Sequence, residues 1–222
     1  MSTLLLAGCA STPRIPPQQP MMSGITDKPT VQSPQTKLRG GPDARLAVLL
    51  SSNTIANTQY LRERQTAFDE KFDGNAWSAP YQLVLDPGFS LAWIAHSLRQ
   101  RFGTVMLVPD ANAAINGRFD GIAVVDVFFE PYDKGIPEST AHVTVAFYDA
   151  QFRYIGAAGG KEYKAATGFC CWAYSEVVAL ARTHQKTIAN ALQDFDTRLP
   201  YLVETSPGGV PKPRNNAVGA TR

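Results

Sequence analysis

The stretch Gly121-Ile-Ala-Val-Val-Asp-Val-Phe-Phe-Glu130 is apolar at nearly every position, which is typical of a central strand that is covered on both faces. Two alternating stretches follow over residues 141–148 and 152–158, and Asp149-Ala-Gln joins them at hairpin length. In the first of these, Val143, Val145 and Phe147 share one face, and His142, Thr144 and Tyr148 share the other. The three stretches predict an antiparallel meander.

Further elements are predicted on both sides of this meander. Apolar runs at 45–50, 81–85 and 104–108 predict short strands, and a helix is predicted at 58–72. Asp86 and Pro87 resemble an N-cap and a first helical residue, and Gly103 follows the apolar stripe as a stop signal. Residues 174–199 predict a long amphipathic helix, with its stripe at Val177, Ala181, His184, Ile188, Ala191 and Phe195.

This order of elements predicts an α/β (α+β) domain over residues 45–203. We expect a mixed, largely antiparallel sheet with helices packed mainly on one face, because each apolar stripe needs a surface to cover it. The 222 residues include 21 basic and 19 acidic side chains, a balance that gives no electrostatic case for nucleic acid as the main partner. No apolar run approaches the roughly 18 residues that a spanning helix needs.

The N-terminus carries the motif Leu6-Ala7-Gly8-Cys9. It resembles the lipobox of bacterial lipoproteins, in which the peptide bond before the cysteine is cleaved and the cysteine is acylated. The resemblance implies that residues 1–9 are signal and lipobox, and that Cys9 is the lipid anchor. Ala10 is similar to the outer-membrane sorting pattern, so we expect an outer-membrane protein that faces the periplasm.

The segments at both ends are polar and proline-rich. Only eight residues precede Cys9 and none is basic, so we expect the native precursor to begin upstream. Residues 10–44 contain seven prolines among many Ser, Thr and Gln, which predicts a disordered tether. Residues 204–222 predict a disordered C-terminal tail.

The order of elements behind a lipobox and tether resembles several small periplasmic lipoprotein groups. These are the outer-membrane activators of penicillin-binding proteins, the curli-secretion lipoprotein and the auxiliary lipoproteins of ABC transporters. The resemblance covers about residues 45–199, through the strand Asp120-Gly-Ile-Ala-Val-Val-Asp126 and the hairpin Phe147-Tyr-Asp-Ala-Gln-Phe-Arg-Tyr154. It is architectural, and it transfers no binding residue.

Titratable residues are scattered along the chain rather than grouped. His96, His142 and His184 stand on separate predicted elements, so their spacing predicts no metal site, and we expect His184 to be a hydrogen-bonded core residue. Asp126 shares a strand face with apolar residues, and we expect it to satisfy a backbone amine or pair with a cation. Alternatively, Asp126 could form a carboxylate pair for glycan cleavage with one of the nearby acids, Glu130 or Asp133.

The sequence contains no motif for a nucleophile or a phosphate-binding loop. There is no Gly-x-Ser-x-Gly, P-loop or Gly-x-Gly-x-x-Gly after a strand, and we predict no cofactor. The glycine-rich residues 156–160 predict a bulge or turn at a strand end.

An aromatic segment, Gly168-Phe-Cys-Cys-Trp-Ala-Tyr174, precedes the last helix. Cys170 and Cys171 lack the Cys-x-x-Cys spacing of redox catalysts, which leaves open buried thiols, a local disulfide or an intermolecular link. If exposed, Phe169, Trp172 and Tyr174 would form a partner-docking patch, because aromatic side chains dominate interface energetics. If they cover the core, they say nothing about function.

These observations favour a non-enzymatic lipoprotein that docks onto, activates or scaffolds an envelope protein complex. The alternatives are a ligand-binding protein or enzyme acting on cell wall or lipid, and a self-assembling subunit of a pore or secretion machine. The ligand-binding alternative requires a concave pocket that brings Asp126 or His184 next to other polar groups.

Overall fold

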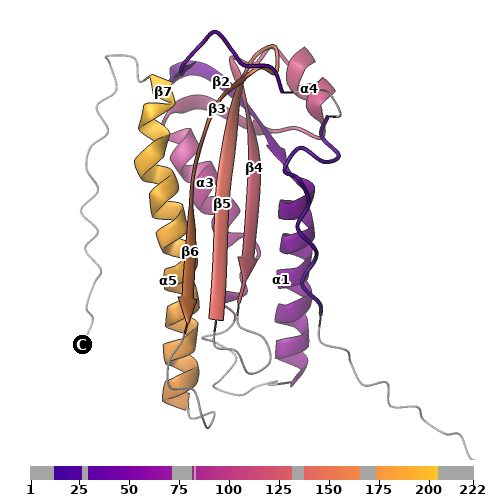
Figure 1. The fold of residues 1–222 in the computed structure, drawn as a ribbon, viewed down its shortest axis with the longest axis vertical. Helices are drawn as coiled ribbons and strands as arrows, with labels where there is room; N and C mark the ends of the chain where they lie inside the picture. The colour runs from indigo at the N-terminus through magenta and orange to yellow at the C-terminus, as the bar shows by residue number, and fades with distance from the viewer. Residues whose placement is uncertain are drawn as a thin grey trace, which may run out of the picture.

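The computed structural model describes residues 13–26, 30–71, 82, 84–131, 138–165 and 174–204. The main sheet and its helices run along the long axis of the molecule (Figure 1). The helices are α1 (Ser52–Lys71), α3 (Phe89–Arg99), α4 (Ala111–Asn116), α5 (Tyr174–Arg198) and the 3-10 turn η1 (Leu199–Tyr201). The strands are β1 (Leu38–Arg39), β2 (Gly41–Leu50), β3 (Phe102–Leu107), β4 (Gly121–Glu130), β5 (Glu138–Asp149), β6 (Tyr154–Ala165) and β7 (Val203–Glu204).

The five long strands form one sheet in the order β3-β2-β4-β5-β6. β2 is parallel to both β3 and β4, whereas β5 is antiparallel to β4 and to β6. The predicted meander is therefore confirmed, and β4 has the predicted bounds. The α/β class with a mixed sheet is also confirmed. β1 and β7 form a separate parallel pair that joins the two ends of the domain.

The two faces of the sheet are covered by different kinds of structure. Helices α1, α3 and α5 pack on one face, where β4 contributes Ala123, Val125, Val127 and Phe129. On the other face, α4 and part of the N-terminal segment pack on Ile122, Val124 and Tyr148. The three longest helices thus share one face, as the amphipathic stripes predict. None of the helices within the described residues is long and apolar enough to cross a membrane.

The N-terminal strap, which we define as residues 13–26 and 30–37, lies against the domain and extends along α1 and over one end of the sheet (Figure 1). This differs from the disordered tether predicted over 10–44. The strap is held in place because its apolar side chains pack against the core on the two faces of the sheet. Ile15 packs on the helix-covered face, and Met21, Met22 and Ile25 pack on the opposite face. Beyond it, Leu38 of β1 is buried with 1% of its surface exposed.

Strand β4 extends beyond the end of its neighbour β2, and side chains of α1 form hydrogen bonds with the unpaired part of its backbone. The β2–β4 register ends at Leu50 and Val125. Beyond that point the Thr54 hydroxyl donates to the Val125 carbonyl and accepts from the Val127 amide, at 2.9 and 2.7 Å. The Asn57 amide group accepts from the Phe129 amide at 3.0 Å and donates to its carbonyl at 2.9 Å. Helix α1 therefore satisfies the edge of a buried strand.

Three local features test the predictions further. The strand predicted at 81–85 is not formed, because Gln82 and Val84 are helical, and a short apolar run does not distinguish the two states. The glycine-rich residues 156–160 lie within β6, and the predicted irregularity is present next to Gly156, where the register with β5 shifts between Phe147 and Tyr148. A Cβ on Gly160 would come within 2.5 Å of Asp194 on α5, so the glycine permits close helix–strand packing. Helix α4, capped by the Asp110 carboxylate, was not predicted.

We expect Thr54→Val to destabilise the fold by about 1–3 kcal/mol, because the isosteric change leaves the Val127 amide buried without its partner. The Val125 carbonyl loses one of its two hydrogen bonds and keeps the one from the Ser51 amide. Urea unfolding monitored by circular dichroism measures this. The control is Thr66→Val on the same helix, whose exposed hydroxyl bonds only to the Arg62 carbonyl. Equal stability of the two variants would contradict the role of α1 at the edge of β4.

Candidate functional site

Most residues of the predicted docking patch lie outside the described residues. This applies to Phe169, Cys170, Cys171 and Trp172, and to the predicted lipidation site Cys9. Tyr174 is the first residue of α5, and its side chain is not described. The docking patch and the cysteine pair therefore remain predictions.

Asp126 lies on the face of β4 that points away from the long helices, and its carboxylate has structural partners. Its Oδ1 accepts from the Ser51 hydroxyl at 2.5 Å and from the Asn53 amide at 2.9 Å. Asn53 in turn exchanges two hydrogen bonds with the backbone of Gln19, each 2.8 Å long. Asp126 was expected to satisfy a backbone amine or to pair with a cation, but the donors found for it are the side chains of Ser51 and Asn53. The network fastens the N-terminal strap to the start of α1.

Of the two candidate partners of Asp126 in a glycan-cleaving carboxylate pair, Glu130 is half-buried opposite Thr140 and Asp133 lies outside the described residues. The structure therefore brings no second carboxylate to Asp126 within the residues that it describes. The three histidines are also kept apart. His96 bonds to Gln100 and His142 to Thr144, and no cluster of His, Cys, Asp or Glu able to hold a metal ion occurs among the described residues.

His184 is buried in the core, with none of its surface exposed, and its ring lies 6.5 Å from that of Phe129. Burial, and secondarily the positive charge of Arg64, lowers the pKa of His184 to about 4. The imidazole is therefore neutral near pH 7, in agreement with the expectation of a core residue. It borders neither of the two hollows described below.

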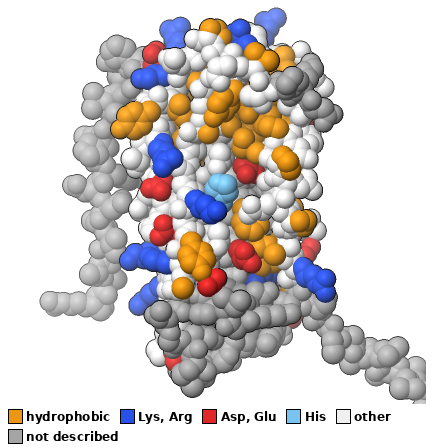
Figure 2. All heavy atoms as spheres, viewed as in Figure 1, with side chains coloured by type: hydrophobic (Ala, Val, Ile, Leu, Met, Phe, Trp, Pro, Cys, Tyr) orange, Lys and Arg blue, Asp and Glu red, His pale blue; other side chains and the backbone are white. Residues whose placement is uncertain are grey.

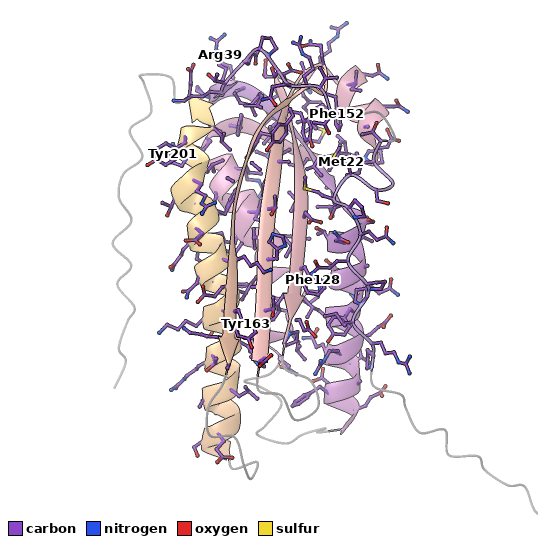
Figure 3. The ribbon with its side chains drawn as sticks, in the orientation of Figure 1. Met22, Arg39, Phe128, Phe152, Tyr163 and Tyr201 are labelled. Carbon is purple, nitrogen blue, oxygen red and sulfur yellow. The ribbon has the colours of Figure 1, made fainter. Side chains whose placement is uncertain are left out.

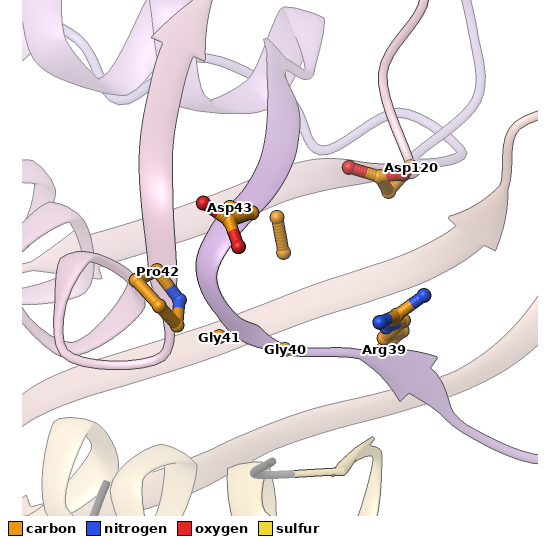
Figure 4. Close-up of a pocket in the computed structure, with 7 residues that line it drawn as sticks. Arg39, Gly40, Gly41, Pro42, Asp43 and Asp120 are labelled. Carbon is orange, nitrogen blue, oxygen red and sulfur yellow. The ribbon is translucent and has the colours of Figure 1, made fainter. Parts of the chain in front are cut away.

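One small hollow of about 170 Å³ lies where β1 leads into β2. Figure 4 shows Arg39 and Asp120 on one side of it and Asp43 on the other. Asp120 accepts a hydrogen bond from the Arg45 amide at 2.8 Å, and the Arg45 guanidinium lies 4.9 Å from the Phe119 ring centroid. These contacts align the starts of β2 and β4, so we interpret the hollow as part of the chain crossing rather than as a binding site.

A larger pocket of about 530 Å³ lies between the N-terminal strap, α4 and the turn of the β5–β6 hairpin, and we call it the hairpin pocket. Met22 and Phe152 lie at this end of the sheet (Figure 3), where hydrophobic side chains gather on the surface (Figure 2). Its apolar lining consists of Met22, Ile25, Val31, Ala111, Ile115, Tyr148 and Phe152. Its polar lining consists of Thr26, Thr30, Asp110, Asn112, Gln151 and Arg153.

The base of the hairpin pocket is held by the buried carboxylate of Asp149. This carboxylate accepts from the Ser33 hydroxyl and the Arg153 guanidinium, both at 2.7 Å, and from the amides of Gln151 and Arg153. Burial alone would raise the pKa of Asp149, but the hydrogen bonds outweigh it and the pKa is lowered. Asp149 is thus ionised at neutral pH and fixes both the hairpin turn and the strap.

An aromatic pair forms the floor of the pocket. The rings of Tyr148 and Phe152 are stacked with centroids 4.7 Å apart, and Phe152 holds a positive φ of 62° in the turn. The Tyr148 hydroxyl donates to the sulfur of Met22 at 3.1 Å. Burial, followed by the effect of Tyr154, raises the pKa of Tyr148 to about 12, so it stays protonated at neutral pH. The floor is therefore neutral and apolar.

The rim exposes two large apolar side chains. Val31 on the strap is 57% exposed and Ile115 on α4 is 44% exposed. The charged groups of the lining already have partners, since Asp110 caps α4 through the Ala113 amide and Arg153 pairs with Asp149. The pocket can therefore receive an apolar group, whereas no described pair of its side chains is arranged as a nucleophile and its base.

Sequence reasoning found only part of this pocket. The alternating pattern that ends at Tyr148 located the hairpin, but the strap was predicted to be disordered and α4 was not predicted. The usable signal was the group of apolar residues Met21, Met22 and Ile25 within the proline-rich segment. Neither Asp126 nor His184, the residues that the ligand-binding alternative requires, lines the pocket.

No protein-family model matches the sequence, and no curated protein matches it. Among solved structures, the chain is similar to a variant of the PelC dodecamer from Paraburkholderia phytofirmans, at 13% identity and a TM-score of 0.35 over 77% of this chain and 95% of that one. A second crystal form of the PelC dodecamer from that organism gives 14% identity and a TM-score of 0.34, over 71% and 93% of the two chains. At these TM-scores the likeness carries no conclusion about the function or assembly of this chain.

We expect the stability of the protein to decrease as the pH falls from about 6.5 to 4. The pKa of His184 is about 4 in the folded protein and has an ordinary value of 6.5, so the unfolded chain binds more protons in this window. The loss attributable to His184 is about 3 kcal/mol. Urea unfolding at several pH values measures it. His184→Phe should flatten the slope and the control His96→Gln should keep it; an unchanged slope in His184→Phe would contradict the assignment.

Proposed function

We propose that this chain is a membrane-anchored, non-enzymatic docking component of a bacterial envelope complex. In this proposal Cys9 carries the lipid anchor at the periplasmic face of the outer membrane, and the hairpin pocket receives an apolar side chain of an envelope protein. The observation that carries the proposal is the exposure of Val31 and Ile115, which line that pocket from the strap and from α4.

The lining of the pocket supports docking in two ways. First, large apolar side chains exposed around a concave, aromatic-floored pocket are typical of interface cores. Covering Val31 and Ile115 would contribute about 1 kcal/mol each, because each is only partly buried already. Second, Asp149 holds the turn and the strap together before any partner arrives, so little ordering entropy is lost on binding.

We prefer docking to an enzymatic function because the candidate acid and base groups are hydrogen-bonded within the fold or buried. Asp126 is engaged by Ser51 and Asn53, and Asp149 by Ser33 and Arg153. His184 is buried away from both hollows. These groups stabilise the fold, so none of them is available at the pocket surface as an acid or base.

The anchor is tested by metabolic labelling with radioactive palmitate in a bacterium that processes lipoproteins. We express the chain behind a complete lipoprotein signal sequence that ends in the native residues Leu6-Ala7-Gly8-Cys9. Cys9 should incorporate the label, and Cys9→Ser should not, because the acyl group is attached through that residue. Cys170→Ser is the matched control and should label normally. Equal labelling of Cys9→Ser would contradict the proposed anchor.

The docking site is tested by photo-crosslinking in cells. A photoreactive residue at Asn112 or Gln151, both in the pocket lining, should give one discrete adduct, and the exposed Gln193 on α5 serves as the control position. Ile115→Glu should reduce the adduct at least tenfold, because it places a charge where an apolar group would be buried. Mass spectrometry identifies the captured protein.

A matched control separates docking from a general loss of stability. Ile55→Glu changes an equally apolar residue that is 57% exposed on α1 and is not part of the pocket lining, and it should leave the adduct unchanged. An adduct that forms equally in Ile115→Glu, or the absence of any adduct from both pocket positions, would contradict docking through the hairpin pocket.

A further inference from the structure

Strand β3 forms one edge of the sheet, and within the described residues it pairs with β2 alone. The Val108 amide donates to the Val48 carbonyl at 2.9 Å, which fixes the phase of the parallel ladder. Since backbone groups alternate in direction along a strand, Thr104 and Met106 bond toward β2. The amides and carbonyls of Gly103, Val105 and Leu107 therefore point outward from the sheet.

The two edges of the sheet differ in their protection against pairing. β6, at the other edge, carries Lys161, Glu162 and Lys164, and the N-terminal strap bridges to it at Tyr154. Charged residues and covering segments of this kind are the usual means of blocking edge-to-edge association. Among the residues that the structure describes, β3 has neither: the sequence Phe-Gly-Thr-Val-Met-Leu contains no charge, and Met106 and Leu107 are 46% and 64% exposed.

We propose that the outer edge of β3 is a homodimer interface, at which β3 of a second copy pairs antiparallel across a twofold axis. In an antiparallel ladder, residues whose backbone groups point outward face each other in hydrogen-bonded pairs. The register centred on Val105 uses all three of them, because Val105 then opposes Val105 and Gly103 opposes Leu107. This register forms about six backbone hydrogen bonds and joins two sheets into one.

The same register covers the exposed side chains on both faces of the sheet. Leu107, on the helix-covered face, lies opposite Gly103 of the second copy, where the Pro42 backbone occupies the place of a side chain. Met106, on the other face, lies opposite Thr104. A register chosen from backbone directions alone thus places each exposed apolar side chain beside a smaller residue, and cross-strand pairs of this kind stabilise sheets.

The charges at the two ends of β3 favour the antiparallel arrangement and a second copy as the occupant. Arg101 precedes the strand and Asp110 follows it. Antiparallel pairing brings Arg101 of one copy near Asp110 of the other, whereas parallel pairing of two copies would bring like charges together. The C-terminal residues of the same chain are a poorer occupant, because Pro207, Pro211 and Pro213 interrupt the backbone donors that a strand needs.

Sedimentation equilibrium of the full chain with Cys9→Ser, under reducing conditions, tests the proposal. The expected mass is about twice the 24.1 kDa of the chain. Leu107→Lys should sediment as a monomer, because it places a charge in the middle of the new sheet. Ile55→Lys alters a residue 57% exposed on α1 and should remain a dimer. A monomeric parent chain, or an assembly that Leu107→Lys leaves intact, would overturn the proposal.

A crosslinking measurement tests the register itself. In a chain whose three native cysteines are replaced by Ser, Val105→Cys should give a disulfide-linked dimer on oxidation, because hydrogen-bonded antiparallel partners lie about 5.5 Å apart at Cα. Tyr163→Cys, 55% exposed on β6, should give none. Failure of Val105→Cys to crosslink, or equal crosslinking through Tyr163→Cys, would overturn pairing through Val105.

Discussion

The fold depends on the need to pair every backbone group of the buried strand β4. Its edge toward β5 is paired along the whole strand, but its other edge has a strand neighbour only as far as Val125. Thr54 and Asn57 complete that second edge from α1. This requirement explains why α1 begins directly after β2 and why its first turns lie against the edge of β4.

The opposite face of the sheet is covered by the N-terminal strap instead of a long helix. Two carboxylates fasten the strap: Asp126 reaches Gln19 through Asn53, and Asp149 binds Ser33 directly. Asp126 and Asp149, which could serve as an acid or base elsewhere, therefore hold the strap against the sheet here. The hairpin pocket arises from this arrangement, because the strap and α4 do not meet completely over Tyr148 and Phe152.

Sequence patterns were reliable where the environment is uniform along an element. The alternation of β5 and the apolar run of β4 predicted their pairing, and the stripe of α5 predicted a buried His184. The strand prediction for residues 81–85 was wrong, since a run of five mostly apolar residues fits either a strand or a helical turn. The prediction of a disordered tether was also wrong for the strap. Its few apolar residues pack against a surface that exists only after the sheet has formed. For the same reason, the hairpin wall of the candidate site was predicted, whereas the walls formed by the strap and by α4 were not.

The sequence by itself determined the α/β class, the meander, the long final helix and the lipobox-like motif at Cys9, because these depend on local periodicity or on adjacent residues. Only the tertiary structure decided which polar residues meet. Asp126 lies 73 positions from Asn53, and Asp149 lies 116 positions from Ser33. It also decided which strands lie at the edges of the sheet, since the order β3-β2-β4-β5-β6 differs from the order along the chain. Such contacts depend on how distant segments pack, which no local pattern records.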